Sequence, residues 1–262
     1  MKSSLVACAA AVAALLLTPA YSSAQRVPRA PDGKPDLSGV YQPGSDILGT
    51  WAEANPSALN DPAPGQAQNP RRAAVREIEG GTIPYQAWAQ KKILDAWERR
   101  NADDTMARCI PELDLGGGAL YPLQIVQTPK LVVILVESRH VFRLIPIDAK
   151  HDPDFDSSYL GDSVGHWEGD TLVVDVTNFK ERLVGSKISS DALHVVERYT
   201  RVDQNIINYE AHVEDPKTLT RPYNIKSKYA LRPGTRLQEY VCENNETPQQ
   251  VDELDQKGLI KR

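Results

Sequence analysis

Ionisable side chains interrupt several segments that otherwise have the composition of β-strands, and their types suit proton transfer. The stretch DALHVVERYTRVD, residues 191–203, carries His194, Glu197 and Arg198 among Val, Tyr and Thr residues. Successive side chains of a strand point to opposite faces, so Glu197 shares a face with Tyr199 and two aliphatic residues. If that face is the core, Glu197 is a buried carboxylate, which must be paired, hydrogen-bonded or protonated.

Similar residues occur in neighbouring strand-like segments. Glu137 ends LVVILVE, Arg143 interrupts HVFRLI, and Tyr209 lies within IINYEAHVE. Antiparallel strands folded side by side would gather several of these groups around one interior, and such a polar pocket with apolar walls supports acid–base chemistry. The expected catalytic residues are Glu137 or Glu197 as general base and His194 or His151 as proton shuttle; the expected substrate-binding residues are Arg143, Arg198, Tyr199 and Tyr209.

Other interpretations of these residues stay open. Buried Glu–Arg pairs also occur simply to hold sheets in register. For any one of these residues, a structural role is therefore the preferred interpretation. The five histidines could bind a metal, but no two are two or four residues apart, and we expect neither a metal nor another cofactor. A Ser–His–Asp triad is a weaker alternative, for which Ser163, Ser190 and Asp191 are available.

The segment AKHDPDFDSSYLGD, residues 149–162, concentrates acidic side chains between two strand-like segments. Its spacing does not match an EF-hand loop, so we expect a solvated loop rather than a calcium site. With His151 near its start, the loop could border the mouth of a pocket.

The positioning elements are mostly short strands with hairpin-length connections. A strand at 38–42 and the segments YPLQIVQT, LVVILVE and HVFRLIPID are followed by a hairpin that turns at Gly169 and Asp170. A second hairpin spans VDQN, and a third joins YNIKSKYAL to RLQEYVC across RPGT. About nine such strands predict a mainly β fold, an antiparallel meander closed as a lipocalin-like (calycin-like) β-barrel spanning residues 106–245.

Residues 25–105 read as an irregular arm, rich in Pro, Gly and Asp, that contains one amphipathic helix at about 84–101. Helical spacing places Trp88, Ile93, Leu94 and Trp97 near one face, which we expect to pack on the domain. Residues 246–262 are expected to form a polar tail.

Residues 1–24 have the layout of a secretory signal peptide: Lys2, an apolar run from Leu5 to Leu17, and small residues before a cleavage point. A short membrane anchor is the alternative. We therefore expect a periplasmic or secreted protein with no transmembrane segment after processing. In such a compartment Cys109 and Cys242 are most simply a disulfide.

The net charge of −5 argues against a nucleic-acid partner, which requires a clustered basic surface. The oligomeric state is not fixed by the sequence.

The segments PDLSGVY, GDSVGHWEGDTLVVDVTNF, SDALHVVERYTRVD and EYVCENN resemble an uncharacterised group of secreted bacterial β-rich proteins, over about residues 35–245. In that group Trp often stands at the place of Tyr41, and Arg at the place of His166. The segment LSGVY is also similar to the Gly-x-Trp start of lipocalin-like barrels. The resemblance implies export and a β fold, and it carries no catalytic residue.

The leading hypothesis is an exported, cofactor-independent enzyme that acts by acid–base chemistry, as a lyase, isomerase or hydrolase, on a small, partly apolar molecule in a barrel lumen. The alternative is a binding protein that captures a small apolar ligand without chemistry. A third possibility is an envelope interaction protein that uses its N-terminal arm.

Overall fold

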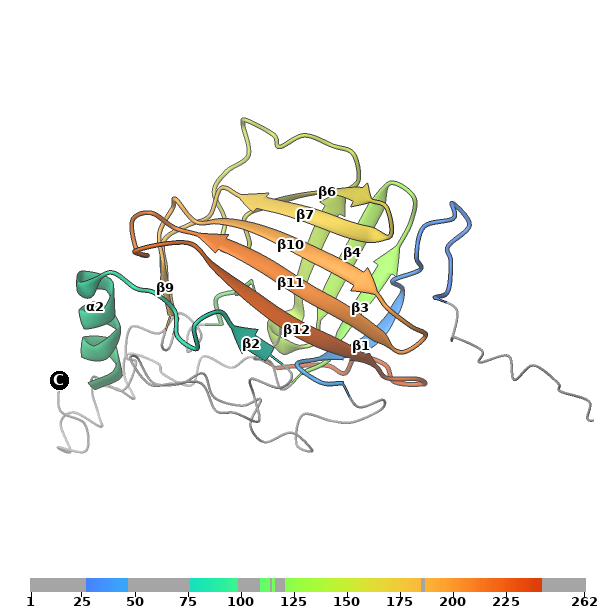
Figure 1. The fold of residues 1–262 in the computed structure, drawn as a ribbon, viewed down its shortest axis with the longest axis horizontal. Coiled ribbons are helices and arrows are strands. Elements are labelled where there is room, and N and C mark those ends of the chain that lie inside the picture. Colours follow the sequence, from blue (N-terminus) through green and yellow to red (C-terminus); the bar gives the residue numbers. More distant parts are fainter. Residues whose placement is uncertain are drawn as a thin grey trace, which may run out of the picture.

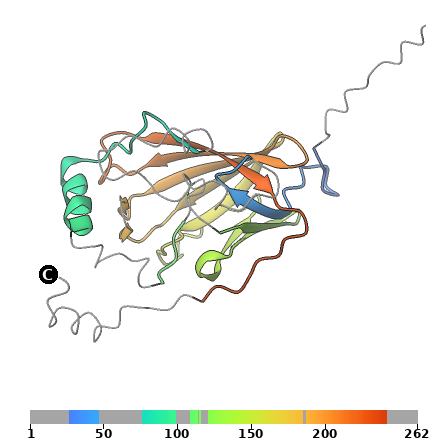
Figure 2. The same cartoon turned by 90° about the horizontal axis from the view of Figure 1, so that it is seen from below.

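The structure is a computed structural model, and it describes residues 27–46, 76–98, 109–113, 115, 121–184 and 187–241. One large antiparallel sheet dominates these residues and curls round on itself (Figures 1 and 2). Its strands are β1 (Gly39–Pro43), β2 (Arg76–Ile78), β3 (Leu123–Gln127), β4 (Leu131–Val136), β5 (Val141–Pro146), β6 (Asp162–Glu168), β7 (Thr171–Thr177), β10 (His194–Arg201), β11 (Ile206–Glu214) and β12 (Tyr223–Leu231). The predicted mainly β, antiparallel, barrel-like fold is confirmed.

The order of strands across the sheet is β5-β4-β3-β1-β12-β11-β10-β7-β6, and β2 pairs with β12 beside β1. The two end strands, β5 and β6, nearly close the barrel. A parallel bridge joins Ile147 to Gly165, and the Asp148 N–H donates to the Gly165 carbonyl at 2.7 Å. A Cβ at Gly165 would lie 2.9 Å from the Ile145 side chain, so a glycine permits this close approach.

The two predicted hairpins with short local turns are confirmed. Residues 169–170 join β6 to β7, and residues 202–205 join β10 to β11. The third predicted hairpin is wrong, because residues 232–241 form no strand after β12. The edge of β12 that such a strand would occupy is already paired with β1 and β2, which come from the segment expected to be an irregular arm.

Alternate side chains along the strands point inward and fill the barrel interior. On β10 the buried residues are Val195, Glu197, Tyr199 and Arg201, as the sequence pattern predicts. Aliphatic residues from β3, β4, β7 and β11 pack with tyrosines from β1, β10, β11 and β12 in one continuous core. The interior is therefore a packed core that contains one buried charged pair, described below.

Helix α2 (Ala87–Glu98) lies beyond one end of the barrel, beside the small sheet of β8 (Arg182–Val184) and β9 (Lys187–Ser189) (Figure 1). Its buried stripe is Ala89, Ile93 and Ala96, which pack against Leu183 and Ile188. The expected face is corrected in part, because Ile93 is buried but Trp88 and Leu94 are exposed; the side chain of Trp97 lies outside the described residues. Two alanines flanking Ile93 present a smaller surface that lets the helix approach the β8–β9 hairpin closely.

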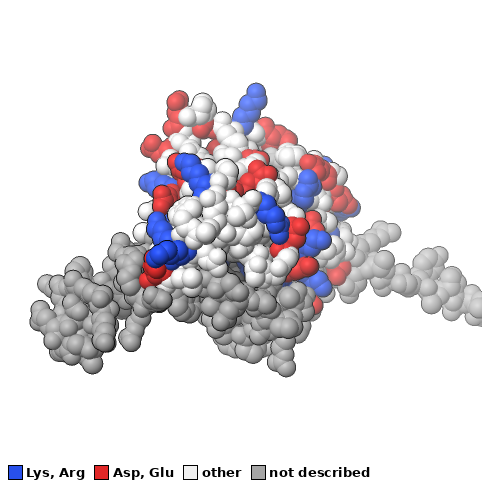
Figure 3. All heavy atoms as spheres, turned by 60° about the vertical axis from the view of Figure 1, so that its left-hand side comes forward, with Lys and Arg blue, Asp and Glu red and all other residues white. Residues whose placement is uncertain are grey.

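Within the described part of the chain, no helix has the length and apolar character needed to cross a bilayer. On the face shown in Figure 3, acidic and basic side chains are interspersed around an uncharged central area. No large patch of a single charge sign therefore covers that face.

Candidate functional site

A buried ion pair lies in the barrel interior, on strands that are not neighbours in the sheet. Arg143 of β5 donates from Nη2 to Glu197 Oε2 at 2.6 Å and from Nη1 to Glu197 Oε1 at 3.2 Å, and the Glu197 side chain is 0% exposed. Desolvation by burial would lower the pKa of Arg143, but the charge and hydrogen bonds of Glu197, together with Tyr199 and Tyr209, outweigh it and raise the pKa. The two-pronged geometry is the one in which a planar guanidinium binds a carboxylate.

Two tyrosines complete the environment of Glu197. The hydroxyls of Tyr199 and Tyr209 both donate to Glu197 Oε1, at 2.9 and 3.0 Å. Burial, together with the nearby carboxylate, raises the pKa of each phenol well above its ordinary value. The two rings meet edge to face with their centroids 5.1 Å apart, and Tyr209 stacks on Tyr229. Glu197 thus accepts four hydrogen bonds and serves as a fully satisfied counter-ion.

A cavity of about 400 Å³ opens at the seam where β5 and β6 separate. Most of its lining is apolar, and Phe142 and Leu144 of β5 stand on its rim with 60% and 53% of their surface exposed. Arg143 and Ser163, both 6% exposed, supply polar groups at the same cavity. The remaining lining residues are Pro111, Arg139, Val141, Phe155, Ser158, Leu160, Gly161 and Asp162. Small-molecule sites have this character, with volumes of about 300–1,000 Å³.

Ser163 connects the buried ion pair to this cavity. Its Oγ accepts a hydrogen bond from Arg143 Nη2 at 3.1 Å. A hydroxyl that accepts from a cation keeps its own hydrogen as a donor and becomes a stronger one. Arg143 Nε makes no hydrogen bond to any group of the described residues. The cavity therefore presents a polarised hydroxyl donor backed by a guanidinium.

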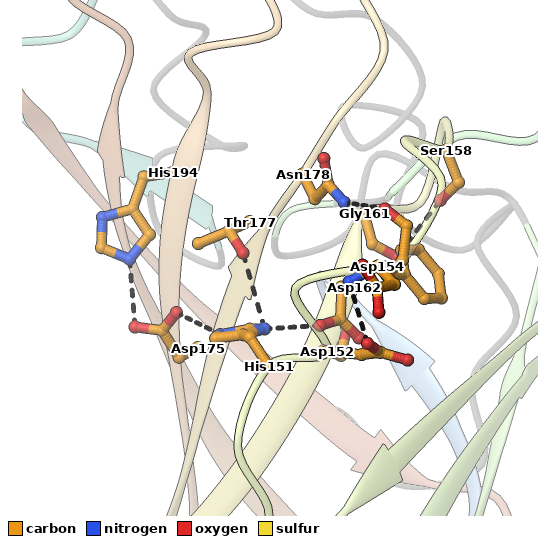
Figure 4. Close-up of polar contacts among 12 residues, drawn as sticks. His151, Asp152, Asp154, Ser158, Gly161, Asp162, Asp175, Thr177, Asn178 and His194 are labelled. Carbon is orange, nitrogen blue, oxygen red and sulfur yellow. Dashed lines mark hydrogen bonds and ion pairs between the residues drawn. The ribbon is translucent and has the colours of Figure 1, made fainter.

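The loop of residues 149–161 forms one side of the cavity, and His151 fastens it to the barrel. His151 Nδ1 lies 2.7 Å from Asp162 Oδ2, and His151 Nε2 lies 2.9 Å from Asp175 Oδ1 (Figure 4). The Thr177 hydroxyl is 3.5 Å from His151 Nδ1. One imidazole thus bridges two carboxylates, one at the start of β6 and the other on β7.

The bridge changes the proton affinity of its members. Burial disfavours the charged imidazole, but hydrogen bonds and charges from Asp162 and Asp175 outweigh it and raise the pKa of His151 above 6.5. Burial would likewise raise the pKa of Asp175, yet hydrogen bonds from His194 and His151 lower it below 3.8. In the charged form of His151 both ring nitrogens carry hydrogen and donate, one to each carboxylate.

Asp162 is the carboxylate of this bridge that lines the cavity. Its side chain is 15% exposed, and only Oδ2 is engaged by His151. Among the hydrogen bonds of the described residues, none from a side chain reaches Oδ1 of Asp162. This oxygen can therefore accept a further hydrogen bond or a proton.

The bridge continues along the outer face of the sheet, away from the cavity. Asp175 Oδ2 lies 3.0 Å from His194 Nε2, and His194 Nδ1 lies 3.8 Å from Glu214. Glu214 in turn lies 3.0 Å from His212. Acids and imidazoles thus alternate across the outer faces of β7, β10 and β11. No group of three or more His, Cys, Asp or Glu residues in the described ranges is arranged to hold a metal ion.

The structure divides the sequence-predicted residues among four places. Arg143, Glu197, Tyr199 and Tyr209 meet in the interior, while His151 and His194 lie on the outer acid–imidazole row. Glu137 lies at the start of the 3-10 turn Ser138–His140, where its carboxylate accepts from the Gln238 N–H at 2.6 Å. Arg198 points to the outer face and pairs with Glu168 at 2.8 Å. The predicted single interior site is therefore corrected to an interior pair and a separate row outside it.

The predicted disulfide stays a prediction, because Cys242 lies outside the described residues, as do the predicted signal peptide and polar tail. Sequence reasoning missed Asp162 and Ser163 as cavity residues. The motif GDSVG, residues 161–165, has Gly-x-Ser-x-Gly spacing and could have drawn attention to both. However, Ser163 lies within strand β6 rather than at a strand-to-helix turn, and no histidine of the described residues hydrogen-bonds to it.

Comparison of the chain with protein-family models, with curated proteins and with solved structures finds no match.

Proposed function

We propose that the protein is an enzyme that removes a proton from a small, partly apolar carbonyl compound bound at the β5–β6 seam. The observation that carries the proposal is the meeting of three features in one cavity. These are an apolar rim, the Asp162 carboxylate held by His151, and the hydroxyl of Ser163 polarised by Arg143. A base and an oxyanion donor facing one cavity are the two parts that enolate chemistry needs.

In the proposed reaction, Asp162 Oδ1 takes a proton from the carbon next to the carbonyl. The electron pair of the broken C–H bond forms the carbon–carbon double bond of an enolate, and the negative charge moves to the carbonyl oxygen. Ser163 donates a hydrogen bond to that oxygen, and Arg143 stabilises the charge behind it. Return of the proton to another carbon gives an isomerase, and loss of a leaving group from the neighbouring carbon gives a lyase.

In this scheme Glu197 positions Arg143 rather than acting as the base. Its two oxygens already accept four hydrogen bonds, and its side chain has no exposed surface. His151 holds Asp162 and supplies the neighbouring positive charge. No metal or other cofactor enters the proposed steps, and export from the cytoplasm remains part of the proposal on the strength of the N-terminal sequence.

A non-catalytic binding protein is the second candidate function. The neutralisation of Arg143 by Glu197 favours it, because an internally paired charge adds little attraction for an anionic ligand and leaves the apolar rim to dominate recognition.

The test begins with a screen of small neutral ketones and aldehydes for compounds that raise the melting temperature of the chain. Compounds that bind are then incubated with the protein in D₂O, and loss of the C–H signal next to the carbonyl is followed by proton NMR. The enzyme proposal predicts exchange at least a hundredfold above the protein-free rate. Binding without exchange would overturn it in favour of the binding protein.

A matched pair of variants locates the binding event. Leu144 on the rim and Leu94 on helix α2 are both exposed leucines, and Leu144 alone lines the cavity. We expect Leu144→Ser to weaken ligand binding by roughly tenfold, which corresponds to about 1.4 kcal/mol, and Leu94→Ser to leave it unchanged. Equal affinities in the two variants would place the ligand elsewhere.

A further inference from the structure

A second, smaller cavity lies at the end of the barrel near helix α2 and the β8–β9 hairpin. Its volume is about 40 Å³, roughly the room of three water molecules. Its polar lining residues are Tyr85, Arg182, Lys187, Ser189, Asp215 and Thr218; apolar side chains such as Leu193 and Leu219 complete the wall. Neither the proposed reaction nor the acid–imidazole row uses this cavity.

Two buried polar atoms of residues that line this cavity make no hydrogen bond within the described part of the chain. They are Arg182 Nη1 and Thr218 Oγ1, and the Thr218 residue is only 1% exposed. The guanidinium of Arg182 donates from Nε to Ser189 Oγ at 3.3 Å, its one hydrogen bond to a side chain among the described residues. Buried donors left without acceptors are costly, so two of them at one cavity point to a missing acceptor.

The charges around the cavity favour a negative acceptor. Arg182 and Lys187 lie on its wall, and Arg139 is near enough to act electrostatically on Arg182. Glu112 lies 3.7 Å from both Arg139 Nη2 and Lys187 Nζ, which is longer than a hydrogen bond. Desolvation by burial lowers the pKa of Arg182 by more than Glu112 raises it.

The carboxylate on the wall, Asp215, is occupied by its own turn. Asp215 Oδ2 accepts from the Ser190 N–H, and Oδ1 accepts from the Ser190 hydroxyl and from the N–H groups of Lys217 and Thr218. Both of its oxygens therefore already accept hydrogen bonds from this turn. Among the described residues that line the cavity, two are cations, Arg182 and Lys187, and one is a carboxylate, Asp215.

We propose that this cavity binds a small oxyanion, either the carboxylate of a small organic acid or inorganic phosphate, with Arg182 Nη1 and Thr218 Oγ1 as donors. Guanidinium groups bind oxyanions through charge-assisted hydrogen bonds, and a hydroxyl supplies the additional donor that a second oxygen requires. A cation would meet net positive charge in this cavity. An apolar guest would leave both donors without acceptors.

The experiment measures the melting temperature of the full chain, at constant ionic strength, in sodium phosphate, sodium acetate and sodium chloride. A saturable increase with phosphate or acetate that chloride does not reproduce supports the proposal. The anion that saturates at the lower concentration identifies the source, inorganic phosphate or a carboxylate. Equal melting temperatures in all three salts overturn the proposal and assign the cavity to water.

Variants tie the response to the cavity. We expect Arg182→Gln and Thr218→Val each to weaken the anion response at least tenfold. Thr218→Val keeps the side-chain shape, so it decides the matter if Arg182→Gln does not fold. Arg198→Gln is the control, because Arg198 pairs with Glu168 on the outer face and lines neither cavity. A response that persists unchanged in Thr218→Val, or that is lost in Arg198→Gln, contradicts the proposal.

Discussion

Arg143 on β5 and Glu197 on β10 form a doubly hydrogen-bonded ion pair inside the barrel, although their strands are not paired in the sheet. β5 is one end of the strand order, and β10 lies two strands from the other end. The pair therefore links the two sides of the seam across the interior, and it stands directly behind the cavity that opens between them.

Breaking this pair from one side leaves a buried charge without its partner. We expect Glu197→Gln to lower the free energy of unfolding by about 3–5 kcal/mol, measured by urea denaturation. The control is Arg198→Gln, which removes an exposed ion pair and should cost less than about 1 kcal/mol. The double variant Arg143→Met with Glu197→Gln should recover part of the loss, and additive losses would contradict the pairing.

The two tyrosine hydroxyls stabilise the same oxygen of Glu197. Because hydrogen bonds to a charged group contribute about 1.5–3 kcal/mol, Tyr199→Phe and Tyr209→Phe should each lower the free energy of unfolding by about that amount. Combining them should give a non-additive loss, since both share one acceptor. Tyr159→Phe, with no hydroxyl contact in the described residues, should change stability by less than about 0.5 kcal/mol. A similar loss in all three variants would indicate that the hydrogen bonds to Glu197 are not the cause of the destabilisation.

The His151 bridge makes stability depend on pH. The pKa of His151 is raised above 6.5 on folding, so its contribution is fully present below pH 6.5 and is lost as the pH rises through the folded value. The pKa of Asp175 is lowered below 3.8, so its contribution is present above that pH and is lost as the pH falls through the folded value.

The corresponding measurement is the melting temperature of wild type and His151→Gln between pH 5 and pH 9. At low pH we expect the wild type to melt at a higher temperature than His151→Gln, by an amount equivalent to roughly 1 kcal/mol. At high pH we expect the two proteins to melt at the same temperature. His166→Gln is the control, because the exposed His166 pairs with the exposed Glu168 on the surface. A difference in melting temperature between wild type and His151→Gln that stays constant from pH 5 to pH 9 would exclude the charged bridge.

Gly161 fixes the end of the cavity loop by its backbone conformation and its lack of a side chain. Its φ is +71°, and a Cβ there would lie 2.6 Å from the Thr177 carbonyl oxygen. We expect Gly161→Ala to cost more than about 2 kcal/mol of unfolding free energy in urea. Gly169→Ala, at φ +59° but in open space, should cost only about 1 kcal/mol. Equal losses in the two variants would mean that the contact with the Thr177 carbonyl oxygen does not affect stability.

The local part of the fold could be predicted from the sequence because its signals are local. The turn at Gly169 and the alternation on β10 each depend on residues within a single hairpin, and the alternation correctly places Glu197 and Tyr199 on the same face. The strand expected at 236–242 is wrong because pairing with β1 and β2 occupies that edge of β12. The competition of distant segments for one strand edge cannot be predicted from the sequence of either segment alone.

The site was predictable only in part for the same reason. Alternation places Arg143 and Glu197 on inward faces, and their opposite charges allow them to pair. The meeting of His151, Asp162 and Asp175 depends instead on the path of an irregular loop, which no periodic pattern records. Outward-facing His194 was grouped with the interior residues, although the same alternation places it on the opposite face from Glu197.

The most direct test of the proposed function compares deuterium exchange catalysed by wild type, Asp162→Asn and Asp156→Asn on one bound carbonyl compound. Asp156 is an exposed carboxylate in the same loop and does not line the cavity. We predict that Asp162→Asn lowers the exchange rate at saturation at least a hundredfold with ligand affinity within about tenfold, while Asp156→Asn matches wild type. Undiminished exchange in Asp162→Asn would contradict the account.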